Sequence, residues 1–113
     1  MESILTSIKK LLGSTEDYEH FDTDIIIFAN GIFSTLNQVG VGPDEGFAIS
    51  DKNDKWSDFT CDRKILNMVK PYMALKVKLQ FDPPQSSAVM KSYEETVKEY
   101  EWRMNVAAES ETI

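Results

Sequence analysis

Two adjacent prolines, Pro83 and Pro84, constrain the folding of this 113-residue chain more than any other feature. Proline lacks a backbone N–H and its ring clashes with the preceding turn, so neither residue fits inside a helix. Each proline also pushes the residue before it out of the helical region, and one helix therefore ends at Asp82. The short connection predicts a helical hairpin with its turn at Phe81, Asp82, Pro83 and Pro84.

Apolar residues recur at intervals of three and four in four segments, which is the spacing of amphipathic helices. Capping residues precede these segments, and glycine or proline follows them. The pattern predicts an all-α fold, a small helical bundle. The segments are residues 4–12 after Ser3, 24–39 after Asp22 or Thr23, 65–81 after Asp58 or Asp62, and 88–106 after Ser86 or Ser87.

Pro71 falls inside the third helical segment. One alternative is a helix that kinks at Pro71. The other is a separate short turn, after which the main helix starts with Pro71 at its first position. Both alternatives predict that residues 72–81 are helical.

A long connection from Gly40 to Phe59 separates the second and third helical segments, and it lacks apolar periodicity. The sequence FAIS, residues 47–50, and the segment around Trp56 are expected to pair as a short β-hairpin across DKND. A loop of this length in a small domain favours a role in function.

Length and composition predict one domain over residues 1–113, with residues 108–113 as a flexible polar tail. The net charge of -7 disfavours a protein that grips nucleic acid, because that affinity comes from Lys and Arg on phosphates. Cys61 is the only cysteine, which indicates synthesis in a reducing compartment. The N-terminus lacks the order of a signal peptide and no apolar run approaches a membrane span, so we expect a soluble protein.

Reactive and metal-binding patterns are weak throughout the sequence. His20 lies among carboxylates, but a single imidazole is poor support for a metal centre. The sequence DKNDKW resembles the start of a calcium loop, yet Lys55 and Trp56 occupy the positions of a ligand and of the turn glycine. Cys61 has no base nearby in the sequence. We expect no enzymatic activity, no metal and no cofactor.

Charged side chains of opposite sign are concentrated on the last two helical segments. Lysines of the third segment are expected either to meet glutamates of the fourth on a neighbouring copy or to form a solvated helix face. On the fourth segment, Glu99 and Arg103 are spaced for an i,i+4 ion pair. The candidate charges between copies are Lys70, Lys76, Lys78, Glu94, Glu95 and Glu99.

Trp102 lies off the apolar stripe that Val97, Tyr100 and Met104 form, so a monomer would expose it. Tryptophan and arginine dominate the energetics of interfaces. The end of the fourth segment is therefore a candidate interface, with the residues Trp102, Arg103, Met104 and Val106.

The stretches SIKKLLG, EDYEHFDTDIIIFANGIFSTLNQVGVGP, GFAI, LKVKLQFDPPQSSAVMKS and EWRMNV occur in this order along the chain. Together they resemble the small head-tail connector, or adaptor, proteins of long-tailed bacteriophages. The most specific pieces are FDPP, the helix start FDTDII and the helix end LNQVGVGP. The similarity covers nearly the whole chain; Pro71 departs from it, and the tail after Ala108 is covered least.

The resemblance implies a four- or five-helix protein of the virion neck that assembles as a ring, commonly dodecameric, after synthesis in the host cytoplasm. Such a ring binds the portal on one side and a stopper or tail-completion protein on the other, and the genome passes through its centre. The C-terminal candidate interface would then contact the portal or the adjacent subunit. The long loop would contact the stopper side through Phe47, Trp56 and Phe59.

Two other classes of function stay open at this point. An acidic helical surface also suits a small phage or bacterial regulator that binds and masks a host protein. A hydrolase with unrecognised carboxylates is the third class, since the chain has 19 acidic residues. Ring formation beside a portal separates the connector from the regulator, and a carboxylate scan tests for a hydrolase.

Overall fold

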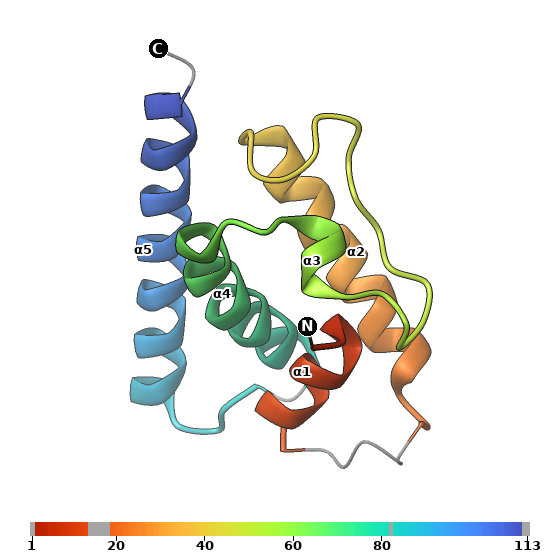
Figure 1. Ribbon diagram of the computed structural model, residues 1–113. Helices are drawn as coiled ribbons and strands as arrows, with labels where there is room; N and C mark the ends of the chain where they lie inside the picture. Colours follow the sequence, from red (N-terminus) through yellow and green to blue (C-terminus); the bar gives the residue numbers. More distant parts are fainter. Residues whose placement is uncertain (1, 14–18, 82, 112–113) are drawn as a thin grey trace.

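The computed structural model describes residues 2–13, 19–81 and 83–111, and five helices account for most of them. They are α1 (Ile4–Leu11), α2 (Asp22–Gln38), α3 (Trp56–Phe59), α4 (Arg63–Phe81) and α5 (Ser87–Glu111). α4 contacts α1, α2 and α5 and so forms the middle of the fold, as Figure 1 shows. The described residues contain no strand, and the predicted all-α fold is confirmed.

The first helix forms as the sequence predicts. The Thr6 N–H donates a 3.3 Å hydrogen bond to Oγ of Ser3, which makes Ser3 the N-cap. Ile4 and Ile8 are buried on one face. The helix ends just before Gly13, whose positive φ of 84° suits glycine at the residue after a helix.

The second helix begins at Asp22, and the residue before it, Phe21, makes no side-chain capping bond. Asp22 is therefore the first helical residue rather than the cap. Its Oδ1 atom lies 2.9 Å from Nζ of the buried Lys9, which joins the start of α2 to α1. The buried face of α2 contains members of the predicted apolar stripe: Ile25, Ala29, Ile32, Phe33 and Leu36.

The predicted β-hairpin in the long loop is wrong. The segment around Trp56 forms the single turn of α3, and the backbone of Ile49 pairs with a side chain of α2 instead of with a strand. The Ile49 N–H donates a 2.7 Å hydrogen bond to Oδ1 of Asn30, and Nδ2 of Asn30 donates a 2.9 Å bond to the Ile49 carbonyl. This one amide supplies the donor and the acceptor that a second strand would have supplied.

The fourth helix is continuous through Pro71, so the alternative of a separate turn before Pro71 is wrong. Of the two predicted caps, Asp62 precedes the helix, and its Oδ1 accepts a 2.9 Å hydrogen bond from the Lys64 N–H. A proline inside a helix removes the hydrogen bond to the carbonyl four residues earlier, here that of Asn67. Asn67 is exposed, so water is available to that carbonyl.

The last two helices form the predicted hairpin, in which α5 packs along α4. Ser86 caps α5, because the Val89 N–H donates to its Oγ at 3.4 Å. Pro83 and Pro84 lie between the helices, whereas Asp82 is outside the described residues. α5 continues through Glu111 and Ala108 is buried, while residues 112–113 are outside the described residues. The flexible tail over residues 108–113 stays a prediction.

The core is filled by large side chains from every helix, including Trp56 from α3 and Tyr72 from α4. The loop after α2 approaches this core closely at Gly42, which has a φ of 93°. A Cβ atom at this position would collide with the ring of Phe59. Glycine is therefore required there both for its backbone conformation and for the packing of that ring.

Candidate assembly surfaces

The side of α5 that points away from α4 carries residues spaced by four, three and four positions. Residues at this spacing lie on one helix face. Trp102 is 66% exposed and Val106 is 41% exposed, whereas Val97 on the opposite face is buried. The face is acidic toward the start of α5 and apolar toward its end. We call it the outer stripe, and its members are Glu95, Glu99, Trp102 and Val106.

The predicted C-terminal interface does not form a single surface. Met104 is buried in the core, because it shares a helix face with Val97, so it is not available to a partner. Trp102, Arg103 and Val106 are exposed. Nη2 of Arg103 lies 2.8 Å from Oε1 of Glu99, which confirms the predicted i,i+4 pair. Such an exposed pair contributes little to stability.

An apolar groove of about 560 Å³ lies between the end of α1, the middle of α4 and the start of α5. Leu11 of α1 is 59% exposed beside it. A space of this volume is in the range that accommodates a small ligand or a large side chain. We call it the lysine-rimmed groove, and it is lined by Leu11, Lys70, Pro71, Ala74, Leu75, Lys78 and Tyr93.

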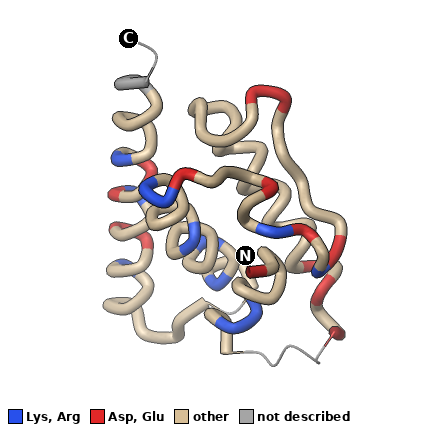
Figure 2. The backbone as a smooth tube through the Cα atoms, in the orientation of Figure 1, with Lys and Arg blue, Asp and Glu red and all other residues tan. Residues whose placement is uncertain are grey.

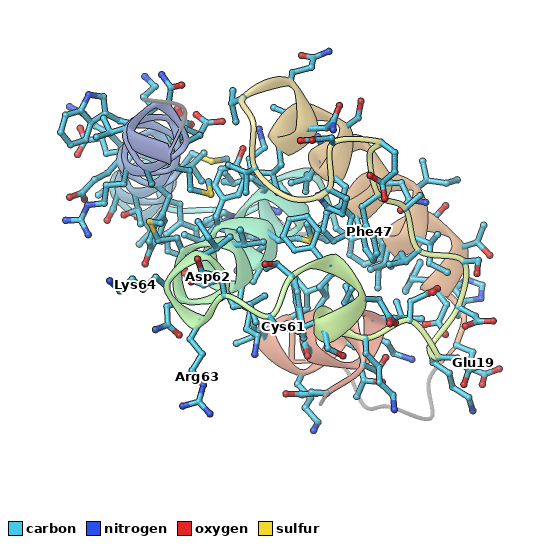
Figure 3. All side chains as sticks on the ribbon, turned by 45° about the horizontal axis from the view of Figure 1, so that its top comes forward. Glu19, Phe47, Cys61, Asp62, Arg63 and Lys64 are labelled. Atoms are coloured by element: carbon cyan, nitrogen blue, oxygen red, sulfur yellow. The ribbon has the colours of Figure 1, made fainter. Side chains whose placement is uncertain are left out.

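Charge is distributed unequally between α4 and α5. α4 contains five basic residues and no acidic one, whereas α5 contains six glutamates and three basic residues, as Figure 2 illustrates. Figure 3 shows Arg63 and Lys64 pointing outward at the start of α4. α4 thus presents positive charge and α5 mainly negative charge.

Lys76 and Lys70, two of the candidate lysines, contact residues of their own chain in ways that bear on the prediction. Nζ of Lys76 lies 3.8 Å from Oε2 of Glu101, and Nζ of Lys70 lies 5.6 Å from the centroid of the Trp56 ring. The acidic partner of Lys76 is therefore on α5 of the same copy. The pairing of Lys70, Lys76 and Lys78 with Glu94, Glu95 and Glu99 of another copy stays a prediction.

The loop aromatics are part of the core. Trp56 is 1% exposed and Phe59 is buried, while the partly buried Phe47 packs edge-on against Phe33 with the ring centroids 4.9 Å apart. The prediction that Phe47, Trp56 and Phe59 contact a stopper protein assumed exposed aromatic side chains. For Trp56 and Phe59 this assumption is wrong, because α3 turns both rings inward.

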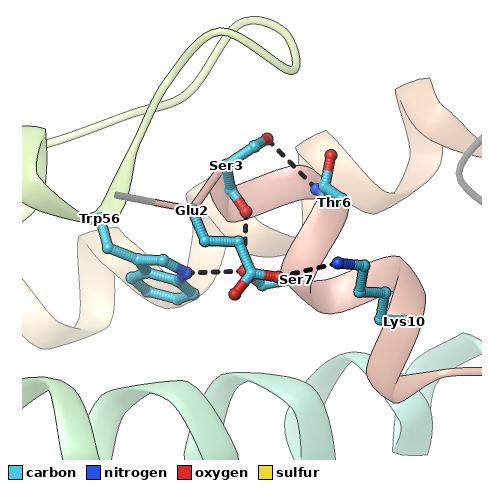
Figure 4. A network of polar contacts seen from close by, with 6 residues as sticks. All are labelled: Glu2, Ser3, Thr6, Ser7, Lys10 and Trp56. Atoms are coloured by element: carbon cyan, nitrogen blue, oxygen red, sulfur yellow. Dashed lines mark hydrogen bonds and ion pairs between the residues drawn. The ribbon is translucent and has the colours of Figure 1, made fainter.

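Trp56 also anchors a polar network between α3 and α1, shown in Figure 4. Its Nε1–H donates a 2.9 Å hydrogen bond to Oγ of Ser7, and the Ser7 hydroxyl donates a 2.7 Å bond to the Ser3 carbonyl. Buried indole N–H groups need such an acceptor. The network fixes the loop to the first helix.

The α4–α5 hairpin is held by a polar contact as well as by apolar packing. The Tyr72 hydroxyl donates a 2.8 Å hydrogen bond to Oε2 of Glu101. Burial raises the pKa of Tyr72, and the hydrogen bond to Glu101 and its negative charge raise it further. The tyrosine therefore stays protonated as a donor across the physiological pH range, which favours a fixed angle between the two helices.

Metal-binding clusters are absent from the part of the chain that the structure describes: no group of three or more His, Cys, Asp or Glu side chains is placed to hold an ion. His20 and Cys61 lie far apart in the sequence, and Cys61 is exposed. Among the described residues, none of the helices is long and apolar enough to cross a lipid bilayer.

Sequence reasoning missed the lysine-rimmed groove, although two signals pointed to exposed apolar residues. Leu11 and Leu12 are adjacent, and two adjacent helical positions cannot both face the core. The run Ile25, Ile26 and Ile27 has the same property, and Ile27 is 60% exposed. The groove itself depends on the placement of α1 beside α4, which local spacing does not determine.

Comparison with known proteins places this fold in a family. The family model described as "Phage connector protein" matches residues 4–111. No curated protein and no solved structure has a significant match to the chain. The matched region includes all five helices, the hairpin and both surfaces described above. The chain therefore belongs to the phage connector protein family.

Proposed function

We propose that this protein is a structural component of the phage neck that forms a ring, with twelve copies in the commonest arrangement, between the portal and a stopper or tail-completion protein. The observation that carries this proposal is the family match over residues 4–111. The ring surrounds the channel through which the genome passes, and the protein performs no catalysis and needs no cofactor.

The charge of the chain supports a role around DNA without attachment to it. A net charge of -7 repels the phosphate backbone, so a ring of such subunits allows DNA to slide. The acidic residues do not need to bind a specific sequence. This argument concerns the ring as a whole and assigns no single residue to the channel.

The overhanging last turn of α5, which lies beyond the outer stripe, is our candidate for the portal contact. α5 has 25 residues and α4 has 19, so α5 is six residues longer, or roughly 9 Å at 1.5 Å per residue. Figure 1 shows the last turns of α5 extending beyond the start of α4. An overhanging helix end can reach a second protein while Met104 and Ala108 keep it attached to the core.

Electron microscopy of the protein mixed with the cognate portal tests this function. We expect a ring of density at the tail-facing end of the portal. Deletion of the gene from the phage should yield DNA-filled heads without tails. Protein that binds a host factor while leaving portals bare would instead support the regulator class and contradict the connector proposal.

A further inference from the structure

We propose that the outer stripe of α5 docks into the lysine-rimmed groove of a second copy of this chain, with Trp102 as the side chain that enters the groove. This inference rests on the proposed ring, and it identifies the surfaces through which neighbouring copies would meet. The occupant is a copy of the same protein, recognised by an indole and by two carboxylates that precede it on the same helix face.

The first argument is the fit of an apolar anchor to an apolar groove. Trp102 is the largest exposed apolar side chain of the described residues, at 66% exposure. The groove has a volume of about 560 Å³, and Leu11, Ala74 and Leu75 contribute its apolar lining. Tryptophan residues that enter such pockets are frequent energetic centres of interfaces.

The second argument is charge complementarity along the two helices. Lys70 and Lys78 border the groove eight residues apart, or about 12 Å along α4. Glu95 precedes Trp102 by seven residues on the outer stripe, or about 10 Å along α5. With Trp102 in the groove, the stripe can place its carboxylates over the positive rim. The attraction acts through the local positive potential and leaves the contacts of the lysines within their own copy intact.

The third argument is that the two surfaces lie on different sides of one molecule. Tyr93 borders the groove from the side of α5 that faces α4, whereas Trp102 points away from α4. A copy therefore cannot fill its own groove with its own Trp102. Contact between unlike surfaces leaves one groove and one stripe open at every step, so it propagates from copy to copy and forms a ring when the rotation between copies closes.

A photo-crosslinking experiment tests the contact directly. A photoreactive phenylalanine analogue replaces Trp102 in the full chain, and the protein is irradiated both concentrated alone and bound to the portal. Copies carrying heavy and light nitrogen are mixed so that mass spectrometry separates crosslinks between copies from those within one copy. We expect crosslinks between copies at residues 70–78. Crosslinks to the portal only, to another surface, or none at all in both samples would overturn the proposal.

Two variants and their mixture give a second readout. Trp102→Ala removes the anchor, and Ala74→Glu fills the groove with a side chain that repels the acidic stripe. Each should weaken self-association by about 30-fold or more, as expected for an interface centre. A mixture of the two retains one intact groove and one intact stripe, so it should form dimers and nothing larger. Native-like assembly of either single variant would contradict the docking.

Ile27→Ala is the matched control, because Ile27 is 60% exposed, close to the 66% of Trp102, but lies on α2, outside the outer stripe. It should assemble as the native protein does. A loss of self-association equal to that of Trp102→Ala would show a nonspecific effect of removing exposed apolar surface. Circular dichroism verifies that each variant is folded. If only the docking proposal is wrong, the protein still binds the portal through other contacts. If the connector function is wrong, the copies still associate with one another but do not bind the portal.

Discussion

The Tyr72 hydroxyl and the Glu101 carboxylate form a 2.8 Å hydrogen bond that joins the middle of α4 to the second half of α5. Lys76 lies 3.8 Å from the same carboxylate oxygen. Glu101 thus receives a neutral donor and a positive charge from α4. A helical hairpin that is stabilised only by apolar side chains can slide, whereas this contact defines the position of one helix along the other.

Tyr72→Phe should lower the free energy of unfolding by about 0.5–1.5 kcal/mol, because it removes the donor of the hydrogen bond to the partly exposed carboxylate of Glu101. The pKa of Tyr72 is raised in the folded state, so the native protein binds this proton more tightly than the unfolded chain. The resulting stability is complete below about pH 10, the usual pKa of tyrosine, and decreases as the pH rises above it. Urea denaturation at neutral and alkaline pH measures both effects. If the variant loses as much stability at alkaline pH as the native protein does, Tyr72 is not the source of that loss.

Trp56→Ala should destabilise the protein by about 3–5 kcal/mol, because it removes a buried aromatic side chain and leaves a cavity under the loop. Thermal denaturation measures the loss. Ser7→Ala is the companion variant: it keeps the indole but removes the acceptor of its N–H, which should cost about 1–3 kcal/mol. A Trp56→Ala protein with native stability would show that the loop does not depend on this anchor.

Asp22→Asn should destabilise the protein by about 3 kcal/mol, because it removes the carboxylate that lies 2.9 Å from the ammonium group of the buried Lys9. Adding Lys9→Met to this variant removes the buried charge while keeping an apolar chain of similar length. The double variant should therefore recover most of the lost stability. Chemical denaturation of the native protein and the two variants provides the comparison, and a double variant no more stable than Asp22→Asn would contradict the charge argument.

Replacing both Pro83 and Pro84 with alanine should loosen the connection between α4 and α5. The change removes two restrictions on the unfolded chain, which costs about 0.4–1 kcal/mol for each proline. It also permits the two helices to merge and exchange between copies. Size-exclusion chromatography should detect the exchanged dimers, and helicity should rise. Pro43→Ala, in the loop after α2, is the control that should stay unexchanged.

The helices were predictable because their signals are local. Ser3, Asp62 and Ser86 cap the helices that the apolar spacing predicts, and the two prolines define the hairpin. The loop was not predictable, because its conformation depends on Asn30, a residue of another element that pairs with Ile49 through its side chain. The continuity of α4 through Pro71 was not predictable either, because the local sequence allows both a helix that passes through the proline and one that starts at it.

For the candidate surfaces, too, the features set by local sequence were predictable and those set by tertiary contacts were not. The exposure of Trp102 follows from its position relative to Val97 and Met104 on one helix, so the sequence predicts it. The same periodicity places Met104 in the core, so its inclusion in the candidate interface was wrong. The burial of Trp56 depends on α3 and on Ser7 of a distant helix, and the groove depends on the position of Leu11 beside α4.

The pairing between the first residues of the chain and the start of α3 has a consequence for folding during synthesis. The Ile4 N–H donates a 3.0 Å hydrogen bond to the Asp54 carbonyl, and the Trp56 N–H donates a 3.3 Å bond to the Glu2 carbonyl. α1 has only eight residues, too few for an isolated helix to be stable in water. The first helix therefore lacks its packing partners, and stays accessible, until roughly half of the chain has left the ribosome. A nascent chain stopped before Asp54 should expose Leu5 and Ile8 to proteases and chaperones, and one that extends beyond α4 should shield them.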